Sequence, residues 1–89
     1  MSDFNEIVSN IKCKQDFLNF IQLLIEDLHK NQWENNTLSS YLEGMEGWVD
    51  DMDGYFKNIQ DYETLRRIEN NELDWKIFAS ILIASSMYE

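Results

Sequence analysis

Acidic residues lie close to a glycine in the middle of the chain, in an order similar to a calcium-binding loop. Asp51 and Asp53 precede Gly54, and helix–loop–helix calcium sites also place acidic ligands before an invariant glycine. When Gly54 is aligned with that glycine, Val49 falls at the first ligand position and Gln60 at the twelfth. Because these two positions normally carry the strongest carboxylate ligands, the sequence predicts no calcium site here.

Two other residues have side chains that could do chemistry. His29 has no second histidine and no cysteine at a zinc-ligand spacing, so we interpret it as a cation at the end of a helix. Cys13 has no histidine near it in sequence, and we interpret it as a capping or partly buried residue. No nucleophile-elbow serine and no glycine-rich phosphate loop occurs. The sequence therefore predicts no catalytic residue, no metal site and no cofactor, and we expect the chain not to be an enzyme.

The charge balance narrows the classes of partner. Seventeen acidic and seven basic residues give a net charge of −10, which would repel nucleic acid and anionic lipid alike. We therefore expect no nucleic-acid or membrane partner, whereas a basic protein or a cation remains compatible with the charge. The lone cysteine excludes a disulfide within the chain, and no signal peptide or stretch of about 20 apolar residues is present. These features favour the cytoplasm.

The elements that must position the polar residues are helices. With 89 residues, 44% of them apolar and no proline, we expect residues 1–89 to form a single all-α domain. The predicted fold class is a small bundle of three main helices plus one or two short helices. We expect a short helix at residues 3–11, main helices at 13–30, 38–54 and 74–88, and a further short helix within 55–73.

The first two main helices have distinct ends and faces. Cys13 and Asp16 resemble a capping box at the start of one, and Thr37 is the expected N-cap of the other, which we expect Gly54 to terminate. The helical period predicts these core faces: Phe17, Leu18, Phe20, Ile21, Leu24, Ile25 and Leu28 in the first, and Leu38, Tyr41, Leu42, Met45, Trp48, Val49 and Met52 in the second.

The outer face of the helix at 38–54 carries four acids at intervals of three or four residues: Glu43, Glu46, Asp50 and Asp53. We call them the acidic stripe. No lysine or arginine occurs between Lys30 and Lys57, so the stripe is either a solvated face or a docking surface for a basic partner. On the same helix, Gly44 and Gly47 indicate either close approach of another backbone or an exposed flank.

A segment before and within this helix carries a resemblance. Residues 33–43 fit the pattern W-E-N-x-T-L-x-x-Y-L-E, followed by W-x-x-D-M-x-x-Y from Trp48, then Trp75 and the closing Tyr88-Glu89. Over residues 13–89 the chain resembles a family of small acidic bacterial proteins of unknown function. Cys13 stands where relatives tend to carry serine, and residues 59–73 resemble a variable insert. The resemblance implies no activity.

The W-E-N motif allows two interpretations. In the structural one, Trp33 covers the core between helices, and Asn35 or Thr37 caps the next helix. In the functional one, Trp33, Glu34 and Asn35 form a surface notch that binds a partner, with Tyr41 at its edge.

Two function classes follow. The first is a small cytoplasmic protein-interaction module, in its most specific form an immunity-type inhibitor that neutralises a basic partner through the acidic stripe. The alternative is a structural subunit with no catalytic role. It would self-associate through the last helix, which is apolar nearly all round, as a homodimer burying Ile77, Ile81 and Ala84. An enzyme or metal binder would instead need a concave polar pocket or a bound ion.

Overall fold

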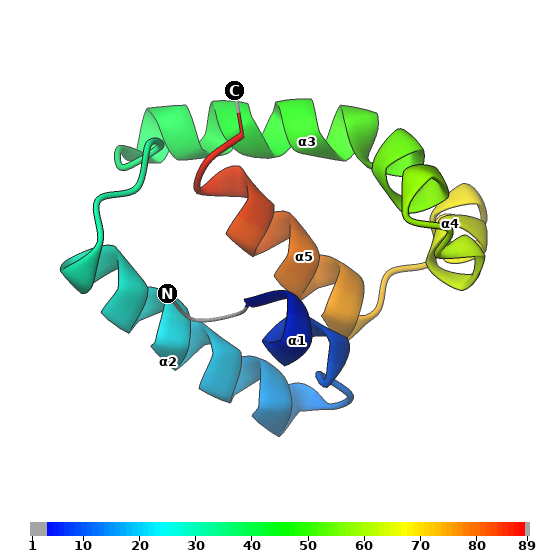
Figure 1. The fold of residues 1–89 in the computed structure, drawn as a ribbon, viewed down its shortest axis with the longest axis horizontal. Coiled ribbons are helices and arrows are strands. Elements are labelled where there is room, and N and C mark those ends of the chain that lie inside the picture. The colour runs from blue at the N-terminus through cyan, green and yellow to red at the C-terminus, as the bar shows by residue number, and fades with distance from the viewer. Residues whose placement is uncertain (1–3, 89) are drawn as a thin grey trace.

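The computed structural model describes residues 4–88 of the chain, and all of its regular structure there is helical. Figure 1 shows three main helices, α2, α3 and α5, with two short ones, α1 and α4. The prediction of a small all-α bundle is confirmed. No described helix is both long and apolar enough to cross a membrane. The helices have these bounds: α1 Phe4–Ser9, α2 Lys14–Lys30, α3 Leu38–Asn58, α4 Tyr62–Glu69 and α5 Trp75–Ser85.

The last helix, α5, is the centre of the fold. It lies between α2 and α3, and α4 lies beyond the end of α3 (Figure 1). We call the side of the molecule that faces the viewer in Figure 1 the near side, and α1 covers part of it. Two core clusters meet α5 from opposite sides. One joins it to α1 and α2 through Val8, Ile11, Phe17, Phe20, Leu24 and Ala79; the other joins it to α3 through Trp48, Phe56, Ile77 and Ile81. This position explains why α5 is apolar nearly all round.

The molecule is thin along one direction. Its principal extents are 35 × 28 × 20 Å, and the shortest is close to two helix diameters of about 10 Å. In the view down this shortest direction, α5 lies between α2 and α3, and α1 lies in front of them (Figure 1); we call the three helices together the α2–α5–α3 layer.

Most helix starts are capped by side chains. Thr37 and Ser40 form a capping box at α3, as predicted for the Thr37 N-cap, and Asp61 and Asp74 cap α4 and α5. Cys13 does occupy the N-cap position of α2, but its side chain makes no capping hydrogen bond. The predicted capping box at α2 is therefore wrong, because a thiol is a weak acceptor.

The end of α3 also differs from the prediction. Gly54 does not terminate the helix, which continues to Asn58, and no glycine in the described chain has a positive φ. The extra turn places Phe56 in the core with 4% exposure, in edge contact with Trp48. Burial of this ring outweighs the modest helix-weakening effect of a glycine. The left-handed residue comes later, at Gln60.

The predicted core face of α3 is confirmed except at its start, where two residues are exposed. Leu38 and Leu42, predicted to lie in the core, are 75% and 52% exposed. Trp48, also predicted to lie in the core, is buried as expected, and so is Gly44, which was not predicted, because α5 packs on that side of α3. In α2 the aromatic part of the predicted face is buried, but three other members of it are exposed: Leu18, Ile25 and Leu28.

Candidate functional site

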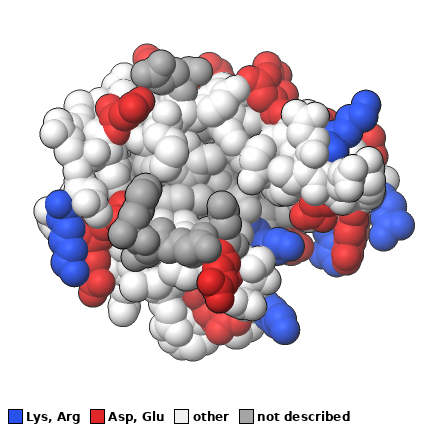
Figure 2. Space-filling view, viewed as in Figure 1, with Lys and Arg blue, Asp and Glu red and all other residues white. Residues whose placement is uncertain are grey.

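The acidic stripe lies on the outer face of α3. All four of its residues are exposed, and Figure 2 shows acidic atoms at intervals along the edge of the molecule where α3 lies. Of the ion pairs found within residues 4–88, Arg67–Glu63 lies within α4, Arg67–Asp74 joins α4 to the N-cap of α5, and Lys76–Asp61 joins α5 to the N-cap of α4. None of them includes the stripe, so its charges are not neutralised by a described neighbour.

The acidic stripe lies on one continuous helix and carries like charges. Asp50, Asp51 and Asp53 lie within continuous α-helix, so no calcium-type loop exists there. Nowhere in the described part of the chain do three or more His, Cys, Asp or Glu residues converge as metal ligands. Like charges at this spacing destabilise a helix by a few tenths of a kcal/mol per pair. The surface is suited to meeting cationic side chains.

The W-E-N segment connects α2 to α3 and is held by the rest of the chain. Trp33 is half-buried, its Nε1 donates to Asp27 Oδ2 at 2.8 Å, and its ring stacks on Tyr41 at a centroid distance of 5.9 Å. The Tyr41 hydroxyl donates to the carbonyl of Leu82 at 2.7 Å, and burial raises the pKa of Tyr41 above its ordinary value. These contacts agree with the structural interpretation of Trp33.

Asn35 or Thr37 was predicted to cap α3, and Thr37 does so. Asn35 does not cap α3. Its side-chain Nδ2 donates to the carbonyls of Ser85 at 2.9 Å and Tyr88 at 2.7 Å, and its backbone N–H donates to the carbonyl of Ser86 at 3.0 Å. Asn35 therefore fastens the segment after α5 to the loop before α3. Of the predicted notch residues, Glu34 is the one with an exposed side chain.

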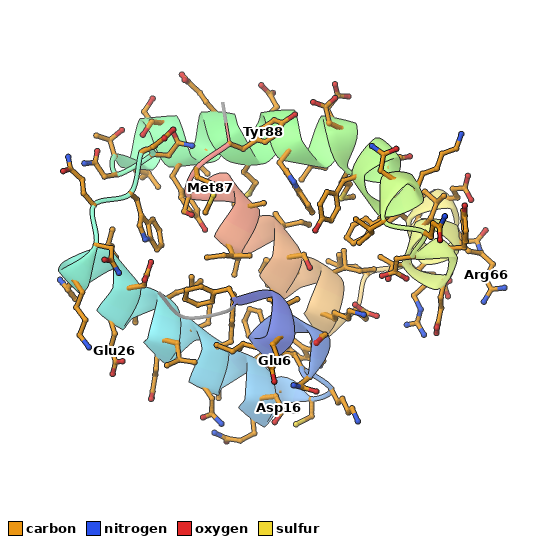
Figure 3. The ribbon with its side chains drawn as sticks, viewed as in Figure 1. Glu6, Asp16, Glu26, Arg66, Met87 and Tyr88 are labelled. Atoms are coloured by element: carbon orange, nitrogen blue, oxygen red, sulfur yellow. The ribbon has the colours of Figure 1, made fainter. Side chains whose placement is uncertain are left out.

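The glycines of α3 allow this segment to come close. A Cβ on Gly44 would lie 2.8 Å from the carbonyl oxygens of both Ser85 and Tyr88, and one on Gly47 would lie 3.2 Å from the Tyr88 ring. Of the two interpretations, close approach of another backbone is therefore confirmed at Gly44. Figure 3 shows Tyr88 lying across α3 on the near side. Its hydroxyl donates to Asp51 Oδ2, and this hydrogen bond is the main cause that raises the Tyr88 pKa.

Two concave regions were not predicted. A polar notch of about 350 Å³ contains Asp61, Arg67, Asp74 and Lys76, but these charged groups pair with one another. An open groove of about 1160 Å³ is lined by aromatic rings of distant segments, including Phe4, Trp33, Trp48, Tyr55 and Phe56. No local sequence pattern could have revealed the groove, because its walls come from different helices.

Two of the three residues expected to form a dimer lie in the core, and the third, Ala84, is partly buried. Ile77 and Ile81 are 1% and 9% exposed and pack with Trp48 and Phe56 of α3, so these two side chains are not available to a second copy. The physical reason is that α5 fills the space between α2 and α3 instead of lying on the surface. Its exposed large apolar residues are Trp75 and Phe78.

Comparison with known proteins places the chain in a family. A family model described as a family of unknown function, DUF7660, matches residues 13–89. The chain belongs to this family. The match has the extent of the predicted resemblance, begins at the residue before α2 and leaves out α1. No curated protein and no solved structure matches the chain.

Proposed function

We propose that this member of the family is a small cytoplasmic protein-interaction module that binds a basic protein through the acidic stripe. The observation that supports the proposal is the set of four exposed carboxylates on one helix face, without a described ion-pair partner. An inhibitor of the immunity type, which neutralises a basic toxin domain, is the most specific form of this proposal.

The physical basis is electrostatic complementarity. A row of like charges on a chain of net charge −10 produces a field that accelerates encounter with a cationic surface. The same row lowers the stability of α3 slightly, and a basic partner would remove that repulsion. Binding of this kind weakens as salt rises, because exposed charges are screened beyond about 8 Å at physiological ionic strength.

The test compares two charge reversals of equal size. E46K/D50K changes the acidic stripe, and E26K/E72K changes two exposed glutamates on α2 and in the loop after α4. Each tagged variant is used to capture proteins from the native cell at low salt, followed by elution with increasing salt. We expect E46K/D50K to lose a basic protein that both the wild type and E26K/E72K retain.

Equal retention by all three forms would contradict the proposal. For the inhibitor form, the captured protein must be a toxin whose activity falls when the wild-type chain is added, and an unaffected activity would refute that form alone.

A further inference from the structure

The side of the α2–α5–α3 layer opposite α1 exposes large apolar side chains from all three helices. They are 38% to 75% exposed. We call them the far face: Leu18 and Ile25 of α2, Leu38 and Leu42 of α3, and Trp75 and Phe78 of α5.

Helix geometry places the α2 members on the side away from α1. Phe4 of α1 makes an edge contact with Phe20 of α2, at a ring distance of 6.0 Å. At about 100° per residue, Leu18 lies about 160° and Ile25 about 140° around the helix from Phe20. These side chains therefore point to the surface opposite the one that α1 covers.

The same geometry applies to α3 and α5. Gly47 faces the Tyr88 ring on the near side (Figure 3), and Leu42 lies about 140° around α3 from Gly47. Ser80 lines the near-side groove, and Phe78 lies about 160° around α5 from it. Phe78 also stacks on Phe17 at 5.1 Å, which links the α5 and α2 parts of the far face.

The far face has an acidic border along α3. Leu42 and Glu46 are one helical turn apart, as are Val49 and Asp53. An apolar row that starts at Leu38 and Leu42 therefore runs beside the acidic stripe. Several large apolar side chains exposed on one side of a small chain are typical of an interaction site, and the acidic border favours a partner with apolar and cationic side chains together.

Resting on the proposed function, we infer that the far face receives a basic amphipathic helix of the partner. Its apolar side would cover Leu38, Leu42 and Phe78 as a fourth helix against the layer, and its lysines or arginines would meet Glu46 and Asp53. A second copy fits less well, because each copy carries a charge of −10 and the same acidic border. The partner helix would cover the apolar side chains of the far face, and its basic side chains would pair with the acidic border.

The test uses a defined peptide rather than a natural partner. The probe is a helical peptide of about 18 residues, or five turns, made of leucine, alanine and lysine with lysines flanking one apolar face. A scrambled peptide of the same composition has no apolar face. Affinity is measured by calorimetry against the full chain, and the contacted residues are located by NMR chemical-shift changes.

Two double variants test whether the peptide binds the far face specifically or any exposed apolar side chains. The side chains removed in the two variants have similar exposed fractions. L38Q/L42Q removes side chains that are 75% and 52% exposed, and I59Q/L73Q removes side chains that are 53% and 63% exposed at the other end of α3 and before α5. We expect L38Q/L42Q to weaken peptide binding by about tenfold or more, as for apolar anchors of an interface. We expect I59Q/L73Q to bind like the wild type.

The outcomes distinguish this inference from the proposed function. If E46K/D50K weakens binding but L38Q/L42Q does not, or if the scrambled peptide binds equally well, the acidic stripe acts alone and the inference is wrong. If L38Q/L42Q weakens binding and E46K/D50K does not, the charge-based function is wrong. Sedimentation that shows a wild-type dimer, but an L38Q/L42Q monomer, would assign the far face to a second copy and overturn the inference.

Discussion

Replacement of Gly44 by alanine should reveal how closely α5 and the following segment approach α3. The added Cβ would lie 2.8 Å from two backbone carbonyl oxygens, those of Ser85 and Tyr88, and 2.6 Å from Asn35 Nδ2. Backbone atoms cannot move aside as the end of a flexible side chain can. Gly54, on the same helix, has no such neighbour within 4 Å of its Cβ position, so Gly54→Ala is the matched control.

The two substitutions should change stability in opposite directions. In a helix interior, alanine is favoured over glycine by about 1 kcal/mol, and Gly54→Ala should gain about that much. At Gly44 the overpacking costs about 1 to 3 kcal/mol. Displacement of Asn35 weakens two side-chain hydrogen bonds, each worth about 0.5 to 1.5 kcal/mol. After the helix gain is subtracted, Gly44→Ala should lower the free energy of unfolding by about 1 to 5 kcal/mol.

The assay is urea unfolding followed by tryptophan fluorescence and far-ultraviolet circular dichroism. In thermal unfolding, each kcal/mol should move Tm by about 4 to 8 °C for a chain of this size. If Gly44→Ala were as stable as the wild type while Gly54→Ala gained stability, the segment after α5 would not lie against α3 and the reasoning would be refuted.

Three further changes test the contacts and charges around α3. Asn35→Ala should lower the free energy of unfolding by about 1 to 3 kcal/mol, because two side-chain hydrogen bonds are lost; an unchanged urea midpoint would contradict this. Glu46→Gln should stabilise the chain by about 0.4 to 1 kcal/mol at low salt, because it relieves repulsion with two stripe neighbours, and a gain that persists in high salt would rule out that cause. The pKa of Tyr88 in the folded chain is raised above its ordinary value of 10.0, because its hydroxyl donates a hydrogen bond to Asp51. This bond therefore stabilises the fold fully at pH values below 10.0, and its contribution is lost as the pH rises through the raised pKa of the folded chain. The wild type should therefore lose more stability than Tyr88→Phe in alkaline unfolding experiments, and parallel losses would show that the bond contributes nothing.

The helices themselves could be predicted because their signals are local. Apolar spacing and the Thr37 cap identify the main helices, and the acidic stripe is found exposed as its spacing predicted. The end of α3 could not be predicted in the same way. The helix extends past Gly54 because its last turn places Phe56 in the core, and that burial depends on the position of the other helices.

The site details depend on contacts between distant residues. The local sequence makes Asn35 a candidate N-cap residue. In the structure, its side chain instead donates hydrogen bonds to residues 50 and 53 positions later in the chain. Leu38 and Leu42 share a helical rhythm with core residues, but α5 packs on a neighbouring face of α3. A single helix pattern shows that a face is apolar, whereas the arrangement of the other helices decides whether that face is buried.

The central position of α5 has a consequence for biosynthesis. On the ribosome α5 emerges after α1 to α4, yet α1, α2 and α3 all pack on it. A nascent chain that stops before Trp75 has helical segments but no helix between α2 and α3 to bury Phe20 and Trp48. The helix around which both core clusters form is thus synthesised after the helices that pack on it. We expect the chain to remain unfolded, with its apolar faces accessible to chaperones, until α5 has been synthesised, and then to fold in one cooperative step.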